Sequence, residues 1–158
     1  YLFYFSGDFT LFRRLVSNYF WYKELIEMKR RLLIIDDESA HSRFLKWILE
    51  DELYQVFTTN SCEEAVNFLS KDLVDLILLD LIMPDADGFE MLNFLKTNEN
   101  LRKIPVIIVS AKNDRETIET SLRKGAIDYI VKPYNSEVLR NKTAIILKTD
   151  LTTKEETD

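Results

Sequence analysis

From residue 30 onward, short apolar runs alternate with segments in which apolar residues recur at helical spacing. The run Leu76–Leu79 is apolar throughout, which is typical of a strand buried on both faces in a parallel sheet. The pattern predicts strands at 31–35, 54–58, 76–79, 106–110 and 128–131. Because strands and helices alternate five times and such crossovers are right-handed, we expect an α/β fold with a doubly wound, five-stranded parallel sheet and helices on both faces.

Helices are predicted between these strands and after the last one. The first three helices span 39–53, 61–71 and 89–97. A fourth helix is capped by Asn113 or Asp114 and ends at Gly125, and a fifth begins at Asn135 or Ser136. Ser61 and Glu64 have the spacing of a capping box. The first three helices are expected to bury Phe44, Leu45, Ile48, Leu49, Ala65, Val66, Phe68, Leu69, Met91, Leu92 and Leu95. In the fifth helix, Lys142 and Thr143 fall where apolar residues are expected.

The first 28 residues differ in composition from the rest of the chain. They hold about half of its aromatic residues, and charged residues interrupt them too often for a transmembrane helix. They also lack the basic start followed by an apolar core that a signal peptide has. Phe9, Phe12, Val16 and Tyr19 are close to helical spacing, which favours an amphipathic helix that packs on the domain or on a second copy in a homodimer. We therefore divide the chain into an extension at 1–28, one domain at 29–148 and a charged, frayed tail at 149–158.

Length and charge narrow the class of protein. The chain has 158 residues, of which 46% are hydrophobic, enough for one domain with a proper core. The net charge of -6 argues against direct binding of nucleic acid, which needs a basic face. Cys62 is the single cysteine, so no internal disulfide can form, which fits a reducing cytoplasm. Cys62 itself is read as a helix-start residue without a redox function.

Polar residues stand where the predicted strands end. Asp36 and Asp37 follow the first strand, Asp80 the third, Ser110 ends the fourth, and Lys132 follows the fifth. The carboxyl ends of parallel strands share one edge of the sheet, so these groups are expected to converge there. Clustered carboxylates raise one another's pKa unless a divalent cation or a lysine shares the site. Acids, a hydroxyl and an ammonium together suit phosphoryl chemistry.

Each of these residues has a plainer interpretation when it is taken singly. Ser110 is then an ordinary strand-end hydroxyl, Lys132 a solvated loop lysine and Tyr129 a half-buried strand aromatic; only their joint placement favours function. His41, the sole histidine, is expected at the surface of the first helix rather than as a catalytic base or a ligand. A role in docking a partner is the alternative for His41.

Four motifs in order carry a family resemblance. They are Ile34–Glu38, Leu78–Gly88, the pair Ser110-Ala111 and the run Asp128–Pro133. Together they resemble the receiver domain of two-component response regulators, over roughly residues 30 to 148. The resemblance implies the flavodoxin-like receiver fold.

The resemblance also implies a phosphoacceptor and a metal. Asp80 matches the nucleophile that takes a phosphoryl group from a phosphohistidine. Asp37 and Asp80 match direct Mg²⁺ ligands, the backbone carbonyl of Ile82 matches a third, and Asp36 acts largely through water. Such a chain catalyses its own phosphorylation and dephosphorylation without being an enzyme in the usual sense.

Other matched positions belong to the switch. Lys132 matches the lysine that pairs with the acids and then with the phosphoryl group, and Pro133 would follow it through a cis peptide bond. Ser110 matches the hydroxyl that moves toward the phosphoryl oxygens, and Tyr129 the aromatic that turns inward behind it. The fourth helix, fifth strand and fifth helix would then present the changed surface.

The partners that the resemblance implies are a sensor histidine kinase or a histidine phosphotransfer protein, and a downstream protein target, in the cytoplasm. Residues after 148 cannot build an output domain, so signalling by protein contact is expected; the alternative is a piece of a longer regulator or hybrid kinase. A phosphorylation-independent binding module is a further alternative. A phosphatase of the haloacid dehalogenase type is disfavoured, because it needs a second Asp where Ile82 stands.

Two positions bear on the lifetime of the phosphoryl group. Ile82 and Lys112 stand where, in the family, the side chain influences how easily water reaches the phosphoryl group. Because Ile82 is branched and apolar, it is expected to hinder water and to prolong the phosphoryl state.

Overall fold

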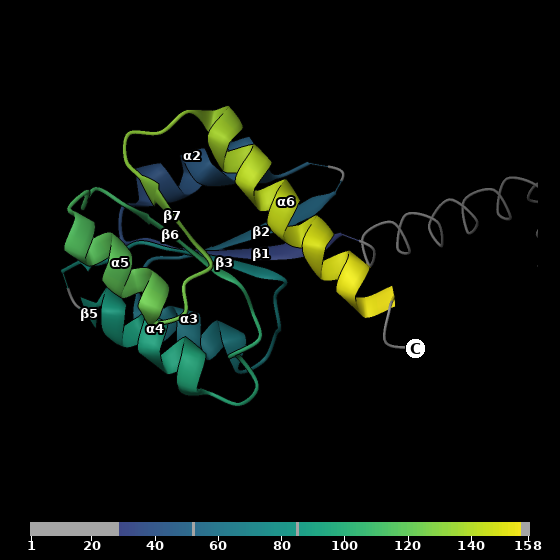
Figure 1. Cartoon of the computed structure of the whole chain (residues 1–158), viewed down its shortest axis with the longest axis horizontal. Coiled ribbons are helices and arrows are strands. Elements are labelled where there is room, and N and C mark those ends of the chain that lie inside the picture. Colours follow the sequence, from purple (N-terminus) through teal and green to yellow (C-terminus); the bar gives the residue numbers. More distant parts are fainter. Residues whose placement is uncertain (1–28, 52, 85, 156–158) are drawn as a thin grey trace, which may run out of the picture.

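The computed structural model describes residues 29–51, 53–84 and 86–155 (Figure 1), so the predicted helix within 1–28 lies outside the described residues. The elements are β1 (Arg30–Ile35), α2 (Ser39–Leu49), β2 (Tyr54–Thr59), α3 (Cys62–Leu69), β3 (Leu76–Leu79), β4 (Ile82–Met83), β5 (Ala86–Asp87), α4 (Gly88–Thr97), β6 (Val106–Ser110), α5 (Arg115–Arg123), β7 (Asp128–Val131) and α6 (Ser136–Glu155).

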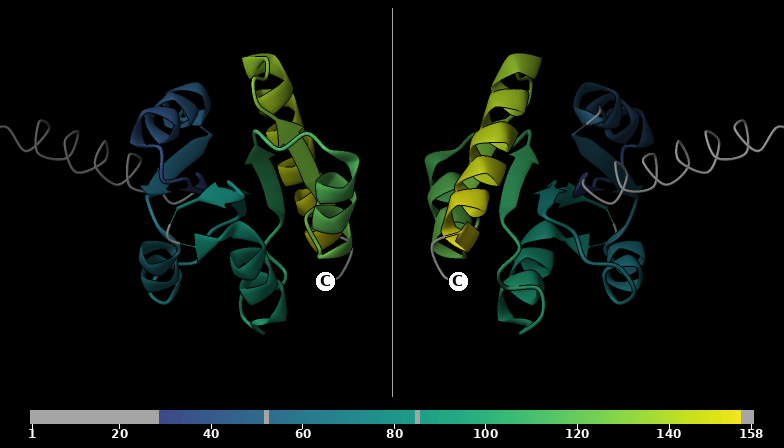
Figure 2. Two further views of the ribbon diagram at one scale, coloured as in Figure 1. Left: turned by 90° about the vertical axis from the view of Figure 1, so that its left-hand side faces the viewer. Right: turned by 90° about the vertical axis from the view of Figure 1, so that its right-hand side faces the viewer.

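Five parallel strands form one sheet in the order β2-β1-β3-β6-β7. Helices α2 and α6 lie on one face of the sheet, and α3, α4 and α5 lie on the other (Figures 1 and 2). The predicted α/β fold is thus confirmed. Strands β1 and β3, which carry the acidic motifs at their ends, are direct neighbours, with Ile35 opposite Leu79.

The strands are buried on both faces, and this explains their unbroken apolar sequence. Successive side chains of β1 point to opposite faces. Leu33 and Ile35 pack in the cluster beneath α3 and α4, whereas Leu32 and Ile34 pack in the cluster beneath α2 and α6. All four side chains are fully buried. Because the apolar residues occupy both faces, polar side chains of this strand are displaced to its ends.

Two helical residues expected in the core lie at the surface. Phe44 is 46% exposed and stacks on Trp47, while Leu45, Ile48 and Leu49 of the same helix are buried as predicted. Val66 of α3 is 37% exposed. Each lies one position away from the line of residues that faces the sheet, so the prediction made these buried faces too wide.

The helix ends follow from side-chain caps. The Ser61 hydroxyl accepts a hydrogen bond from the amide of Glu64, which confirms the first half of the predicted capping box. In the second half, the Glu64 carboxylate accepts from the amide of Asn60 rather than from that of Ser61. Helix α2 ends at Leu49 rather than near 53, because the Asp51 carboxylate accepts from the amides that lead into β2. Helix α6 continues to Glu155, into the segment that was expected to fray.

A short antiparallel hairpin of β4 and β5 separates β3 from α4 and was not predicted. It leads the chain to Gly88, the first residue of α4. A Cβ atom on Gly88 would lie 2.5 Å from Leu81 Cα and 2.7 Å from the backbone oxygen of Asp80. Glycine at this position therefore lets the start of α4 pack directly on the backbone that holds Asp80.

The two polar interruptions of α6 have different environments. Lys142 forms an ion pair with Asp128 at the start of β7. Thr143 is fully buried, and its hydroxyl has no hydrogen-bond partner. A buried hydroxyl without a partner loses its hydrogen bonds to water and gains none in return, so this residue weakens the packing of α6.

We expect Thr143→Val to raise the free energy of unfolding by about 1 kcal/mol, because valine has nearly the same shape and removes the unpaired hydroxyl. Thr59→Val is the matched control, since the buried Thr59 hydroxyl donates to the carbonyl of Ile34 at 3.3 Å. Urea unfolding at neutral pH measures both. Equal changes in the two variants would contradict this account of α6.

Candidate functional site

The polar residues at the strand ends meet at one edge of the sheet. The amide of Asp80 donates to the carbonyl of Ile35, which sets Asp80 beside Asp36. The Lys132 ammonium lies 2.6 Å from Asp80 Oδ2 and 3.0 Å from Asp36 Oδ2. Asp36 is 1% exposed and Asp80 is 7% exposed. Two nearly buried carboxylates therefore share one lysine, from strands far apart in the sequence.

The pKa values of this cluster favour its charged form. Burial alone raises the pKa of the Asp36 carboxyl, but hydrogen bonds from His41 and Lys132 outweigh burial and leave that pKa below its ordinary value. Burial alone lowers the pKa of Lys132, but its bonds to Asp80 and Asp36 outweigh burial and leave it raised. Asp36 and Lys132 thus stabilise each other as ions.

Asp37 and Ile82 lie beside this cluster. The Asp37 carboxylate accepts no hydrogen bond and forms no ion pair with any described residue, and it borders a hollow of about 410 Å³ that Cys62 and Met83 also line. The amide of Ile82 donates to Asp80 Oδ1 at 2.9 Å, and the Ile82 side chain is 48% exposed. Asp80 thus has one oxygen held by the backbone and the other held by Lys132.

Burial raises the pKa of the Cys62 thiol, which disfavours the reactive thiolate.

The donor chemistry of the cluster suits Mg²⁺. Within the described ranges, no three acidic, histidine or cysteine side chains form a group that could hold a metal ion. Mg²⁺ does not need such a group, because it usually keeps several waters and binds through one or two carboxylates. The carboxylates of Asp37 and Asp80, which follow the adjacent strands β1 and β3, supply oxygen donors of this kind. The residues present therefore fit a magnesium ion.

Ser110 and Tyr129 occupy the next two strands. Ser110 is fully buried, and its hydroxyl makes no hydrogen bond, while its carbonyl accepts from the amide of Lys132 at 2.9 Å. The Tyr129 hydroxyl donates to the carbonyl of Lys112 at 2.8 Å, and burial raises the pKa of Tyr129. The Lys132–Pro133 peptide bond is cis, as the resemblance implies. An unpaired hydroxyl thus lies at the same sheet edge as the acids.

His41 is not the surface residue that the sequence predicts. Its side chain is only 14% exposed, Nδ1 lies 2.5 Å from Asp36 Oδ2, and Nε2 lies 2.7 Å from the Tyr134 hydroxyl. The sequence spacing of five residues between Asp36 and His41 carries no such signal, because the contact depends on how α2 is set against the end of β1.

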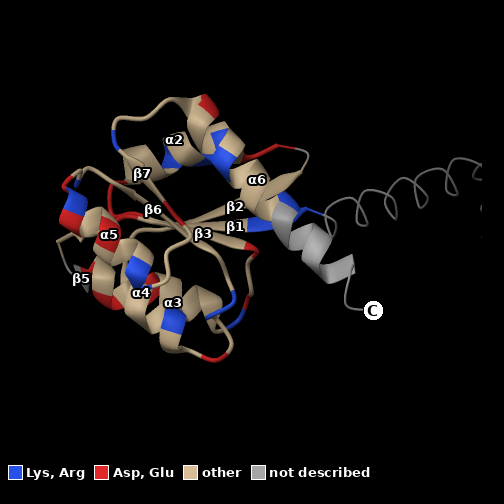
Figure 3. Ribbon diagram, viewed as in Figure 1, with Lys and Arg blue, Asp and Glu red and all other residues tan. Residues whose placement is uncertain are grey.

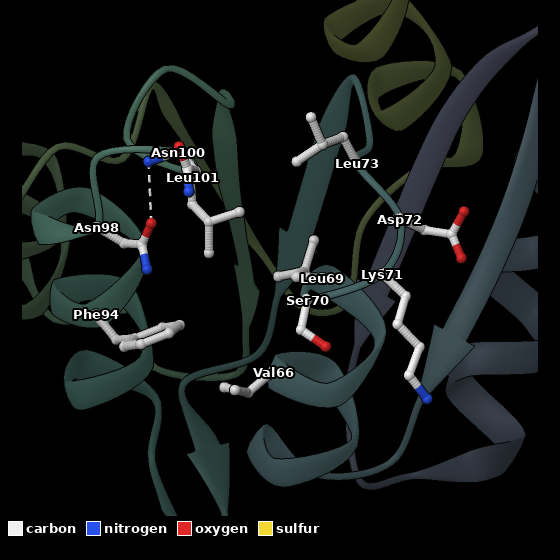
Figure 4. Close-up of a pocket in the computed structure, with 10 residues that line it drawn as sticks. All are labelled: Val66, Leu69, Ser70, Lys71, Asp72, Leu73, Phe94, Asn98, Asn100 and Leu101. Carbon is white, nitrogen blue, oxygen red and sulfur yellow. Dashed lines mark hydrogen bonds between the residues drawn. The ribbon is translucent and has the colours of Figure 1, made fainter.

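A larger hollow lies away from this chemistry. It has a volume of about 580 Å³ and lies between the last turns of α3 and α4 (Figure 4). Leu69, Leu73, Phe94 and Leu101 contribute apolar walls. The hollow is at the edge where the strands begin, opposite the edge that carries the acids, so it plays no part in the candidate site.

Comparison with known proteins identifies the family. The family described as response regulator receiver domain matches residues 32–144, which is more than half of the chain. The chain belongs to the response regulator receiver family. Its fold and its motifs are thus those of the receiver domains of two-component systems.

Individual relatives support this assignment. The response regulator PleD of Caulobacter vibrioides is 37% identical over 112 residues, which cover 71% of this chain and 25% of PleD. A solved CheY-like receiver domain protein from Methanospirillum hungatei has a TM-score of 0.73 and 30% identity, and the match covers 79% of this chain and 98% of that one. The receiver domain of a signal transduction histidine kinase from Syntrophus aciditrophicus has a TM-score of 0.70 and 37% identity, covering 76% and 91%.

The chain spans only a quarter to about half of the length of the curated relatives it matches. Within the described residues no helix is both long and apolar enough to cross a membrane. Basic and acidic residues are interspersed over the helices in Figure 3. Receiver domains of this family interact with histidine kinases and with downstream effectors, and they generally bind Mg²⁺ at the phosphorylation site.

Loss of Lys132 should destabilise the receiver, because it leaves two buried carboxylates without their cation. We expect Lys132→Met to lower the free energy of unfolding at pH 7 by about 3 kcal/mol. Lys142→Met is the control, since its ion pair with Asp128 is more exposed and is expected to contribute less than about 1 kcal/mol.

The effect of Lys132→Met should also depend on pH. The pKa of Asp36 in the folded wild type lies below 3.8, so its contribution to stability is complete above that pH and is lost as the pH falls through the folded pKa. In Lys132→Met, burial of Asp36 is no longer offset by the ammonium, so its folded pKa is higher than in the wild type. The difference between wild type and variant should therefore start to shrink as the pH falls through the folded pKa of Asp36 in the variant, and it should vanish below the folded pKa of Asp36 in the wild type. Urea unfolding between pH 3 and pH 7 measures it, and a pH-independent difference would contradict this electrostatic explanation.

Proposed function

We propose that this receiver is activated by phosphorylation of Asp80. The observation that supports the proposal best is the Lys132 ammonium, which joins the nearly buried carboxylates of Asp36 and Asp80. A carboxylate with one oxygen held by a backbone amide and the other by a lysine is a positioned nucleophile. The phosphoryl donor is a phosphohistidine on a sensor histidine kinase or on a histidine phosphotransfer protein.

The transfer step uses the oxygen of Asp80 that Lys132 contacts. Oδ2 forms a bond to phosphorus while the bond from phosphorus to the donor nitrogen breaks, and the donor leaves with that electron pair. The Ile82 amide keeps Oδ1 in place, which orients the attacking oxygen. Lys132 then neutralises a phosphoryl oxygen in place of the carboxylate. Bound Mg²⁺, held by Asp37, Asp80 and the Ile82 carbonyl, with Asp36 acting through water, would neutralise the charge that gathers on the phosphoryl oxygens.

Phosphorylation would then change the surface of the domain. An aspartyl phosphate brings about two negative charges and three acceptor oxygens to an edge where a buried hydroxyl lacks a partner. Ser110 is drawn toward those oxygens. Tyr129 gives up its bond to the Lys112 carbonyl and turns inward, which alters the face formed by α5, β7 and α6. A downstream protein reads that face.

The setting of this activity is the second part of the proposal. We place the receiver in the cytoplasm, where the kinase domains that supply phosphohistidine act. It transmits its state by protein contact, either alone or as one domain of a longer regulator or hybrid kinase. Dimer formation through residues 1–28 stays a prediction from the sequence.

Asp80→Asn should abolish labelling of the chain by radioactive acetyl phosphate with Mg²⁺, because the amide cannot act as the nucleophile. Asp87→Asn is the matched control and should be labelled like the wild type, since asparagine caps α4 as well as aspartate does. Chelation of Mg²⁺ with EDTA should abolish labelling of the wild type. Labelling of Asp80→Asn at the wild-type rate would contradict the proposal, and an unlabelled wild type would favour a binding module.

Ile82→Asn should shorten the lifetime of the phosphoryl group on Asp80, because a polar side chain in place of the half-exposed isoleucine admits and orients water. We expect the hydrolysis rate of the aspartyl phosphate to increase about tenfold, as judged by loss of label after the donor is removed. The variant Ile82→Val keeps a branched apolar side chain and serves as the control. Equal rates in Ile82→Asn and Ile82→Val would show that this side chain does not restrict water.

A further inference from the structure

His41 and Tyr134 connect Asp36 to the loop that carries Lys132. His41 comes from the first turn of α2, and its Nδ1 lies 2.5 Å from Asp36 Oδ2. Its Nε2 lies 2.7 Å from the hydroxyl of Tyr134, two residues after Lys132, and the two rings meet edge to face at 5.9 Å. The loop after β7 thus reaches Asp36 twice, directly through Lys132 and indirectly through Tyr134 and His41.

The direction of these hydrogen bonds follows from the groups involved. The Asp36 carboxylate only accepts, so Nδ1 of His41 carries the hydrogen. In the neutral imidazole, Nε2 is then an acceptor, and the Tyr134 hydroxyl donates to it. Burial and the charge of Asp36 raise the pKa of Tyr134, so this hydroxyl keeps its proton. Tyr134 therefore holds the imidazole ring with Nδ1 toward Asp36.

Three donors satisfy the buried Asp36 carboxylate. Oδ1 accepts from the amide of Glu38, and Oδ2 accepts from both His41 and Lys132. Among these donors, Lys132 is the one that must leave when a phosphoryl group arrives on Asp80. If His41 were absent, Oδ2 would lose its last donor from the protein at that moment, and the desolvation of this oxygen would oppose the release of Lys132.

We propose that His41 is a positioning residue that keeps the Asp36 carboxylate satisfied while Lys132 moves from Asp36 to the phosphoryl group, and that Tyr134 orients His41 for this task. The inference rests on the function proposed above for Asp80. His41 touches neither the phosphoryl donor nor the attacking oxygen. It acts on the energy of the phosphorylated state through Asp36.

Two substitutions distinguish the contribution of Nδ1 from that of Nε2, because each replaces one ring nitrogen by a side-chain amide. In His41→Asn, the amide nitrogen takes the place of Nδ1 and can still donate to Asp36, but the link to Tyr134 is lost. In His41→Gln, the longer side chain places its amide near Nε2, where it can bond to Tyr134, and the donor to Asp36 is lost. His41→Ala removes both links, and Tyr134→Phe removes only the outer one.

The test uses the full chain of 158 residues and two readouts. The first is the rate of labelling by acetyl phosphate with Mg²⁺, measured against donor concentration. The second is the equilibrium affinity for beryllofluoride with Mg²⁺, a mimic of the phosphoryl group that needs no transfer step. We expect His41→Ala and His41→Gln to be about tenfold weaker in maximal rate and in affinity, with an unchanged KM for acetyl phosphate. His41→Asn should stay within about twofold of the wild type and Tyr134→Phe should fall between.

The outcomes distinguish this inference from the function on which it rests. If the wild type is not labelled, the function of Asp80 fails, whatever the variants do. If the wild type is labelled and His41→Gln matches it, or if His41→Asn is as impaired as His41→Ala, the role of His41 is overturned while the function of Asp80 stands. Urea unfolding of each variant shows which variants fold. If His41→Ala does not fold, the comparison of His41→Asn with His41→Gln is sufficient to test the role of His41.

Discussion

The Lys132 ammonium between two buried carboxylates is the interaction on which the candidate site depends. Asp36 and Asp80 are nearly inaccessible to water, and their strands are held side by side by the ladder of the sheet. Two carboxylates so placed would repel each other without a cation, and one of them would become protonated. Lys132 supplies that cation. It follows β7, which is the second strand from β3 in the sheet. The same bond makes the site responsive, because any group that draws Lys132 away changes the charge balance at both acids.

The location of the site follows from how the core is built. A parallel sheet covered on both faces leaves no room for polar side chains along its central strands, so they gather where the strands end. Gly88 adds a local constraint, because any side chain there would collide with the backbone at Asp80 and Leu81. The packing of α4 and the placement of Asp80 are therefore linked.

In the described part of the chain, two fully buried hydroxyls lack hydrogen-bond partners, and their surroundings differ. Thr143 lies in α6, within the face that packs on the sheet, where an unpaired hydroxyl only weakens the packing. Ser110 ends β6 at the edge that carries the acids and Lys132, where a phosphoryl oxygen can supply the missing partner. Under the function proposed above, the Ser110 hydroxyl is therefore available to a phosphoryl group on Asp80, whereas the Thr143 hydroxyl is not.

The sequence by itself determined the five strands, the order of strands and helices and the residues at the strand ends, because these depend on local apolar runs and on the shared edge of parallel strands. It also predicted the cap at Ser61 and offered Asn113 or Asp114 for the fourth helix, of which Asp114 forms the cap; such caps are local hydrogen bonds. Tertiary structure alone decided that Phe44 lies outside the core and that His41 lies inside the site. Both depend on the rotation of α2 against the sheet, and helical periodicity fixes that rotation only to within about one residue. The distances among Asp36, Asp80 and Lys132 likewise arise only when distant strands pair, since no local pattern encodes the separation of side chains on different strands.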